Sequence, residues 1–152
     1  MAEARIDDRG RAAWQSYRRM RDSVDAEVAR DLERACGLSV AEFEVLDALS
    51  ALETPDGCIR VHGLAAHLGW AYSMLSRLLG RMEQRGLVTR EPCERDGRGD
   101  DVLLAPDGRA ALEAAVPVYF SSVQTRFAGL LTKEQLGHIV AIEQAVTSTD
   151  LG

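Results

Sequence analysis

Two helical segments joined by one tight turn constrain this 152-residue chain more than any other feature. The first is expected over about 61–68 and the second over about 71–85, because Gly69 and Gly86 stand where glycine commonly ends a helix. A pair of this kind is a helix-turn-helix. Inward-facing apolar residues recur in the second helix at spacings of three and four: Leu75, Leu78, Leu79 and Met82. The other faces of that helix carry Tyr72, Ser73, Ser76, Arg77 and Arg81.

A polar hairpin is expected directly after the second helix. Two short β-prone stretches, 87–90 and 101–104, flank the segment EPCERDGRGD, which is too hydrophilic to be buried. Pro92 restricts pairing to the outer part of the first strand or to the tip. A hairpin with a long polar tip in this position predicts a wing. The expected fold is therefore mainly α with a small β-hairpin wing.

Further helices are expected on both sides of this winged unit. A long N-terminal helix, about 8–35, carries an apolar stripe made of Trp14, Tyr17, Met20, Val24, Val28 and Leu32. Ser39 and Glu42 form a capping box that opens the next helix. After the hairpin, one helix begins near Pro106 and should kink at Pro117, and the last begins at Thr132 with a second capping box.

These elements predict one integrated domain with three parts. The N-terminal helix, 1–37, and the C-terminal helices, 106–152, flank a winged helix-turn-helix at 38–105. The apolar faces of the flanking helices exceed what one small unit can cover, and a second copy of the chain would cover them. We therefore expect both flanking parts to serve dimerisation.

The charge of the chain is unevenly distributed. The net charge is −6, yet residues 60–99 hold seven arginines and four acidic residues, so this stretch carries +3 and the remainder −9. A basic middle between acidic ends is the pattern expected when only the middle meets DNA. Lys133 is the only lysine, and the guanidinium forks of the arginines suit phosphate and guanine.

Composition argues against several other classes of protein. The chain is 46% hydrophobic and 28% charged, which is typical of a globular protein. The first residues are charged where a signal peptide needs an apolar core, and no apolar run approaches the roughly 20 residues that span a bilayer. We expect a cytoplasmic protein with no membrane partner. Three scattered cysteines make neither a disulfide framework nor a zinc motif, so no metal or cofactor is expected.

An enzymatic function finds little support in the sequence. His62 and His67 are five residues apart, whereas a spacing of four would place two metal ligands on one helical face. The sequence contains neither a phosphate-cradling glycine loop nor a nucleophile elbow. We expect a binding protein that is not an enzyme.

The order of elements and several motifs resemble the MarR family of bacterial winged helix-turn-helix transcriptional regulators. The matching stretches are LSVAEFEVLDAL, LAAHLGWAYSMLSRLLGRMEQRGLVTR and ERDGRGDDVLLAPDGR, within about 38–109. The family motifs fall on Leu64-Ala65, Ser76-Arg77, Arg85-Gly86-Leu87-Val88, Asp96-Gly97-Arg98 and 104–108. Ala71 and Ala105 stand where the family has capping side chains, a loss of about 1 kcal/mol each. The resemblance implies a homodimeric repressor that binds a palindromic operator.

The expected contacts with double-stranded DNA come from the second helix of the motif and from the wing. Tyr72, Ser73, Ser76 and Arg77 lie in the half of the helix that faces base edges in the major groove, where Arg77 suits guanine. Arg81 and Arg85 would either touch phosphate or pair with an acidic residue. The expected wing contacts are Arg98 in the minor groove, braced by Asp96, with Arg95 as a second choice and Arg90 on phosphate.

The sequence leaves open two modes of regulation and one other function. A small aromatic effector is a further candidate partner, and its conceivable lining residues are Trp14, Tyr17, Arg18 and His62, although a buried aromatic is more often plain core. Redox control would need a reactive thiol such as Cys36 or Cys93, but neither lies at a helix N-terminus or in a dense cluster of cations, the surroundings that activate a thiol. The other function is a winged-helix module that binds proteins and no nucleic acid.

Overall fold

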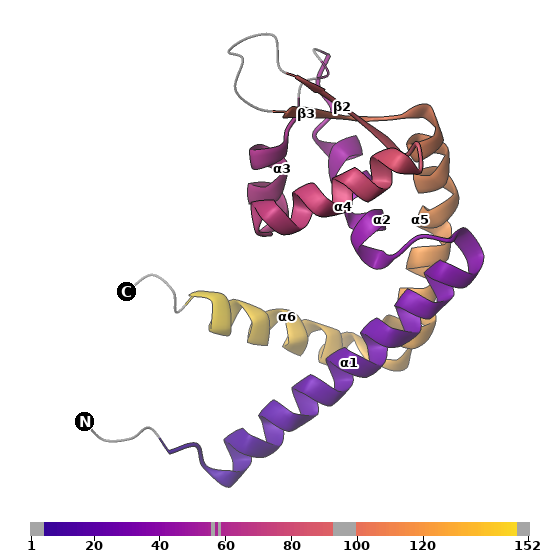
Figure 1. Ribbon diagram of the computed structural model, residues 1–152. Coiled ribbons are helices and arrows are strands. Elements are labelled where there is room, and N and C mark those ends of the chain that lie inside the picture. The colour runs from indigo at the N-terminus through magenta and orange to yellow at the C-terminus, as the bar shows by residue number, and fades with distance from the viewer. Residues whose placement is uncertain (1–4, 56, 58, 93–99, 149–152) are drawn as a thin grey trace. The chain divides into compact units, whose positions relative to one another are not determined.

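The structure is a computed structural model that describes residues 5–55, 57, 59–92 and 100–148 (Figure 1). The elements in this part of the chain are α1 (Asp8–Cys36), α2 (Val40–Ala51), β1 (Ile59–Arg60), α3 (Val61–Leu68), α4 (Tyr72–Gln84), β2 (Val88–Pro92), β3 (Asp100–Leu104), α5 (Pro106–Arg126), the 3-10 helix η1 (Ala128–Leu130) and α6 (Lys133–Thr147). The predicted fold, mainly α with a winged helix-turn-helix, is confirmed. The chain forms two compact units, residues 32–118 and residues 1–31 with 119–152. The assignment of the flanking helices to dimerisation stays a prediction.

The core of the first of these units, residues 32–118, lies between α2, α3 and α4. Leu46, Leu49, Leu64, Leu75 and Leu79 are fully buried there. Their spacing places them on the inner face of each helix, as the sequence predicts. The burial of these leucines fixes which side of α4 remains outside.

Local signals define the ends of these helices. The predicted capping box of α2 is present, since the Ser39 hydroxyl accepts from the Glu42 N–H and the Glu42 carboxylate accepts from the Ser39 N–H, both at 3.1 Å. Gly69 ends α3 in the left-handed conformation, with φ of +68°. The Trp70 N–H then donates to the Ala65 carbonyl at 3.0 Å, which closes the turn into α4.

The wing rests on a three-stranded antiparallel sheet in the order β1-β3-β2. Val88 pairs with Leu104 and Pro92 with Asp100, so the proline stands at the outer end of the ladder, where it interrupts pairing least. The strand β1, in which Ile59 pairs with Val102, was not predicted. It has only two residues, and its pairing partner is distant in the sequence. Residues 93–99, the predicted wing tip, lie outside the described residues.

The helix α5 begins against the backbone that precedes β2. The Ala105 N–H donates to the Leu87 carbonyl at 3.1 Å. One turn later, a Cβ on Gly108 would lie 1.9 Å from the same carbonyl oxygen, so only glycine fits at this position. Pro117 lies inside α5, and the predicted kink there stays a prediction.

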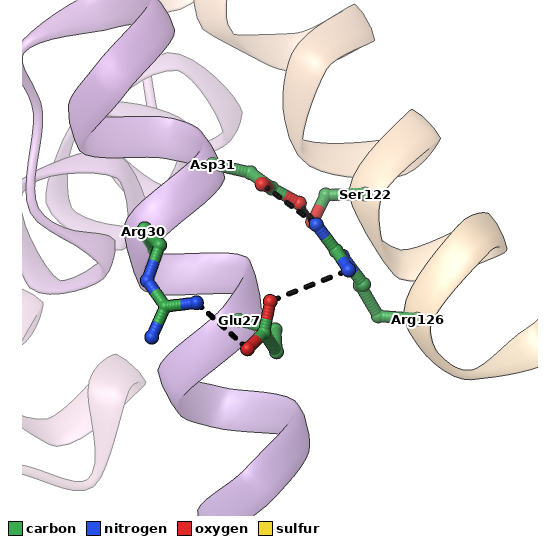
Figure 2. Close-up of polar contacts among 5 residues, drawn as sticks. All are labelled: Glu27, Arg30, Asp31, Ser122 and Arg126. Atoms are coloured by element: carbon green, nitrogen blue, oxygen red, sulfur yellow. Dashed lines mark hydrogen bonds and ion pairs between the residues drawn. The ribbon is translucent and has the colours of Figure 1, made fainter.

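In the unit formed by residues 1–31 and 119–152, a polar cluster joins α1 to α5 (Figure 2). Arg126 donates to both oxygens of Asp31, at 3.1 and 3.2 Å, and the buried Ser122 hydroxyl donates to Asp31 at 2.7 Å. Glu27 lies 3.3 Å from Arg126 and 2.8 Å from Arg30. Hydrogen bonds to Asp31, and next the charge of that carboxylate, raise the pKa of Arg126 above its ordinary value. This guanidinium therefore stays charged over the whole neutral range.

Much of the apolar surface of this unit is uncovered. The predicted stripe of α1 is buried at Val28 but exposed at Trp14, Tyr17 and Met20. The helix α6 starts at the predicted Thr132 capping box, yet none of its residues, all of them described, is buried. Among the described residues, no helix is both long and apolar enough to cross a membrane.

Candidate nucleic-acid interface

One side of α4 stays in contact with solvent. Burial of Leu75, Leu78, Leu79 and Met82 turns the opposite side outward. The exposed residues of this side are Tyr72, Ser73, Met74, Arg77 and Arg81, which we call the α4 face. Neither Arg77 nor Arg81 makes a hydrogen bond or ion pair with any residue that the structure describes. The α4 face therefore presents two guanidinium groups that carry uncompensated charge.

Two further arginines in the same unit are engaged within the protein. Arg85, which was predicted either to touch phosphate or to pair with an acid, forms an ion pair with Glu42 and donates to the Gly37 carbonyl at 2.9 Å. Arg109 pairs with Glu53 at 2.6 Å. Their positive charges are balanced locally, so they offer less to an anionic partner than Arg77 and Arg81 do.

Arg90 connects the base of the wing to α4. Its guanidinium donates to Asp100 on β3 at 2.7 Å and lies 3.4 Å from both the carbonyl and the hydroxyl of Ser76 on α4. The side chain is only 18% exposed. We call this set, Arg90 with Ser76 and Asp100, the Arg90 brace. Arg90 was predicted as a phosphate contact and Ser76 as a groove contact; in the structure they contact each other.

An aromatic stack joins the two helices of the helix-turn-helix. The His62 ring, on α3, lies 4.2 Å from the Tyr72 ring at the start of α4, with the planes inclined by 16°. Both residues are exposed, and Tyr72 retains 40% of its surface. His62 was predicted as a lining residue of an effector pocket, whereas here it contacts a predicted DNA-binding residue.

The other predicted wing residues fall outside the described part of the chain. Arg95, Asp96 and Arg98 lie there, as do two of the cysteines, Cys58 and Cys93. Their roles stay predictions. The remaining cysteine, Cys36, is partly buried at the end of α1, where its thiol lies 4.0 Å from the Ala114 carbonyl.

The remaining predicted effector residues lie on the exposed surface of α1. Trp14 and Tyr17 have ring centroids 5.8 Å apart, the Arg21 guanidinium lies 5.6 Å from the Tyr17 ring, and Arg18 is exposed. A hollow of about 290 Å³ lies elsewhere, between α2 and the end of α3. It is lined by Glu44, Asp47, Ala48, Ala51, His67, Leu68 and Trp70, none of which was predicted. A small aromatic effector stays a prediction. No group of three or more metal-binding side chains occurs among the described residues.

Comparison with known proteins finds a family model that matches the winged unit. A family model described as MarR family matches residues 37–99. The crystal structure of AbsC, a MarR family transcriptional regulator from Streptomyces coelicolor, matches with a TM-score of 0.85 and 27% identity, over 97% of both chains. The winged unit thus matches a MarR family model, and the chain has the fold of a MarR family regulator.

Other relatives match different lengths of the chain. Sco3205, a MarR family regulator from Streptomyces coelicolor solved in complex with DNA, has a TM-score of 0.86 and 26% identity over 97% of this chain and 91% of its own. The transcriptional regulator HosA of Escherichia coli O157:H7 is 37% identical over 75 residues, 49% of this chain and 55% of HosA. The chain thus spans about half the length of the curated relatives it matches.

Sequence reasoning missed three features of the candidate interface. The partners of Arg90 and the stack on Tyr72 join residues from different elements, so no local pattern reveals them. Met74 is 49% exposed on α4 although it is apolar. Its position beside Ser73, outside the inward-facing spacing, was a signal that could have placed it on the α4 face.

Proposed function

We propose that this protein is a MarR family transcriptional regulator that binds a palindromic operator as a homodimer and acts as a repressor. The observation that carries the proposal is the α4 face, where Arg77 and Arg81 are exposed and make no ion pair within the described residues. Other arginines of the same unit, Arg85, Arg90 and Arg109, each pair with a carboxylate. Unpaired guanidinium groups on one helix face can neutralise the phosphates of a polyanionic partner.

The α4 face has the chemistry needed to read base edges. An arginine in the first half of a recognition helix can donate two hydrogen bonds to guanine, worth about 1–3 kcal/mol of discrimination. Ser73 adds a hydroxyl, and Met74 adds an apolar contact for a thymine methyl group. Arg81, one turn beyond Arg77, would neutralise a phosphate. These roles assign base selectivity to Arg77 and general affinity to Arg81.

Uncovered apolar side chains support the homodimer. Trp14, Tyr17 and Met20 on α1 and Ile142 and Val146 on α6 are each more than two-fifths exposed in the single chain. Covering them with a second copy would remove this surface from water. A two-fold dimer of helix-turn-helix units reads two half-sites about 34 Å apart, which corresponds to a palindrome.

The wing would add a contact in the minor groove. Arg98, with Asp96 beside it, would enter a narrow minor groove next to each half-site. A dimer bound in this way over a promoter would exclude polymerase, which is the simplest physical route to repression.

The proposal is tested with duplexes selected from a random-sequence pool on the wild-type protein. Binding to a selected duplex and to a scrambled one is measured by fluorescence anisotropy over a salt series. We expect selective binding that weakens steeply with salt. Arg77→Ala should lose about 5- to 100-fold in affinity for the selected duplex only. Arg81→Ala should weaken both duplexes and lower the salt slope by about one.

Arg109→Ala is the matched control, since it removes a surface arginine that already pairs with Glu53. It should leave both affinities unchanged. Equal binding of the two duplexes by the wild type would contradict sequence selectivity and indicate an architectural role. No binding to any duplex at low salt would reject the regulator and favour a protein-interaction module.

A further inference from the structure

The strongest unexplained contact in the winged unit is the stack of His62 on Tyr72. Ring centroids 4.2 Å apart and planes inclined by 16° describe a close, nearly parallel contact. The two residues come from different helices, His62 from the first turn of α3 and Tyr72 from the first residue of α4. The contact therefore joins the starts of both helices of the motif.

Core packing does not account for this stack. Both side chains are exposed, while α3 and α4 are in contact and each buries a leucine completely, Leu64 on α3 and Leu75 on α4. Two rings held together at the surface bury little apolar area from water. Their effect is on the freedom of the side chains: a lone tyrosine at a helix start can rotate about two torsions, and a ring stacked on one of its faces removes much of that freedom.

We propose that His62 is a positioning residue for DNA recognition, which holds the Tyr72 ring in place before DNA arrives. The inference rests on the proposed function, in which the α4 face enters the major groove of duplex DNA. One face of the Tyr72 ring is covered by the imidazole, and the hydroxyl and the rest of the ring are left for the DNA. Fixing this side chain in advance lowers the entropy cost of binding and narrows the set of base sequences it fits. His62 acts through Tyr72 and makes no contact with DNA of its own.

The test compares variants on the selected and scrambled duplexes defined above. His62→Ala should reduce affinity for the selected duplex about 3- to 10-fold, with little change for the scrambled one. His62→Phe keeps a flat ring without ring nitrogens and should restore affinity to about the wild-type level. In a Tyr72→Ala background, His62→Ala should have no further effect, because the two residues then share no contact. His67→Ala, an exposed histidine of the same helix, is the control and should bind as the wild type does.

Thermal unfolding of each variant separates a binding effect from a folding effect, and the expected transition temperatures are close to that of the wild type. The inference is overturned if His62→Ala binds as tightly and selectively as the wild type. It is also overturned if His62→Phe fails to restore binding, which would mean that the imidazole nitrogens themselves contact DNA, or if the two substitutions are additive. In each of these cases wild-type binding is selective and the proposed function stands. If the wild type binds no duplex, the proposed function fails first.

Discussion

At the scale of single residues, the environment of each side chain separates roles that the sequence does not distinguish. Arg85 and Arg109 are about half exposed, and ion pairs at such positions are worth about 1 kcal/mol or less. Their pairing matters mainly because it cancels positive charge. No described acidic residue pairs with Arg77, so binding to a DNA partner should depend most on this residue.

Two glycines of the same unit also differ in their surroundings. Gly108 leaves no room for a side chain, whereas a Cβ at Gly80, in the middle of α4, would meet nothing within 4 Å. Gly108→Ala should lower the free energy of unfolding by about 3 kcal/mol, because the methyl group collides with the Leu87 backbone. Gly80→Ala should raise it by about 1 kcal/mol through helix propensity. Urea unfolding measures both changes, and equal effects of the two substitutions would contradict this explanation.

At the scale of elements, the start of α4 lacks a side-chain cap, as does the start of α3. Ser39 caps α2 with its hydroxyl, while Ala71 has the extended backbone of a cap residue, ψ of 135°, but no side chain that can accept a hydrogen bond. The missing cap, predicted from the sequence, is confirmed by the structure.

Ala71→Ser should therefore stabilise the protein. The added hydroxyl can accept from a free N–H of the first turn of α4, a gain of about 1 kcal/mol. The change is measured as a shift of the urea midpoint at constant slope. Ala71→Val is the control, since it adds a side chain that has no hydrogen-bond acceptor. An equal gain from valine would show that capping is not the cause.

The Arg90 brace connects the two strands of the hairpin to α4. Arg90→Ala removes the ion pair with Asp100 and both contacts with Ser76, and should cost about 2 kcal/mol of unfolding free energy. Arg77→Ala, the matched exposed arginine, should change it by no more than about 0.5 kcal/mol. Arg90→Lys keeps the charge but cannot reach both partners with a planar fork, so only part of the loss should be recovered. Similar stability of the Arg90→Ala and Arg77→Ala variants would argue against the brace.

At the scale of the whole molecule, the main feature is a set of apolar side chains that the single chain leaves exposed to solvent. Ile142 and Val146 are 62% and 69% exposed on α6. Large apolar patches of this kind mark association surfaces. They belong to the unit formed by residues 1–31 and 119–152, whereas the α4 face belongs to the unit formed by residues 32–118.

Sedimentation velocity tests whether the exposed apolar side chains of α6 form the dimer contact. The wild-type protein should sediment as a dimer, and Ile142→Glu with Val146→Glu should sediment as a monomer, because burying two carboxylates in an apolar contact is costly. Ala66→Glu, an exposed position on α3, adds charge in the winged unit and should remain dimeric. A monomeric wild type, or a double variant that is still dimeric, would contradict the assignment of this surface.

The features that depend on neighbouring residues could be predicted from the sequence alone. The capping boxes at Ser39 and Thr132, the end of α3 at Gly69 and the inward face of α4 follow from interactions within a few positions, and all four are present in the structure. The folded structure was needed to show the pairing of β1 with β3, the partners of Arg90 and the stack of His62 on Tyr72. It also showed that the apolar stripe of α1 is buried at Val28 and exposed at Trp14. These features need residues from separate elements to meet, and periodicity shows which face of a helix is apolar but not what covers it.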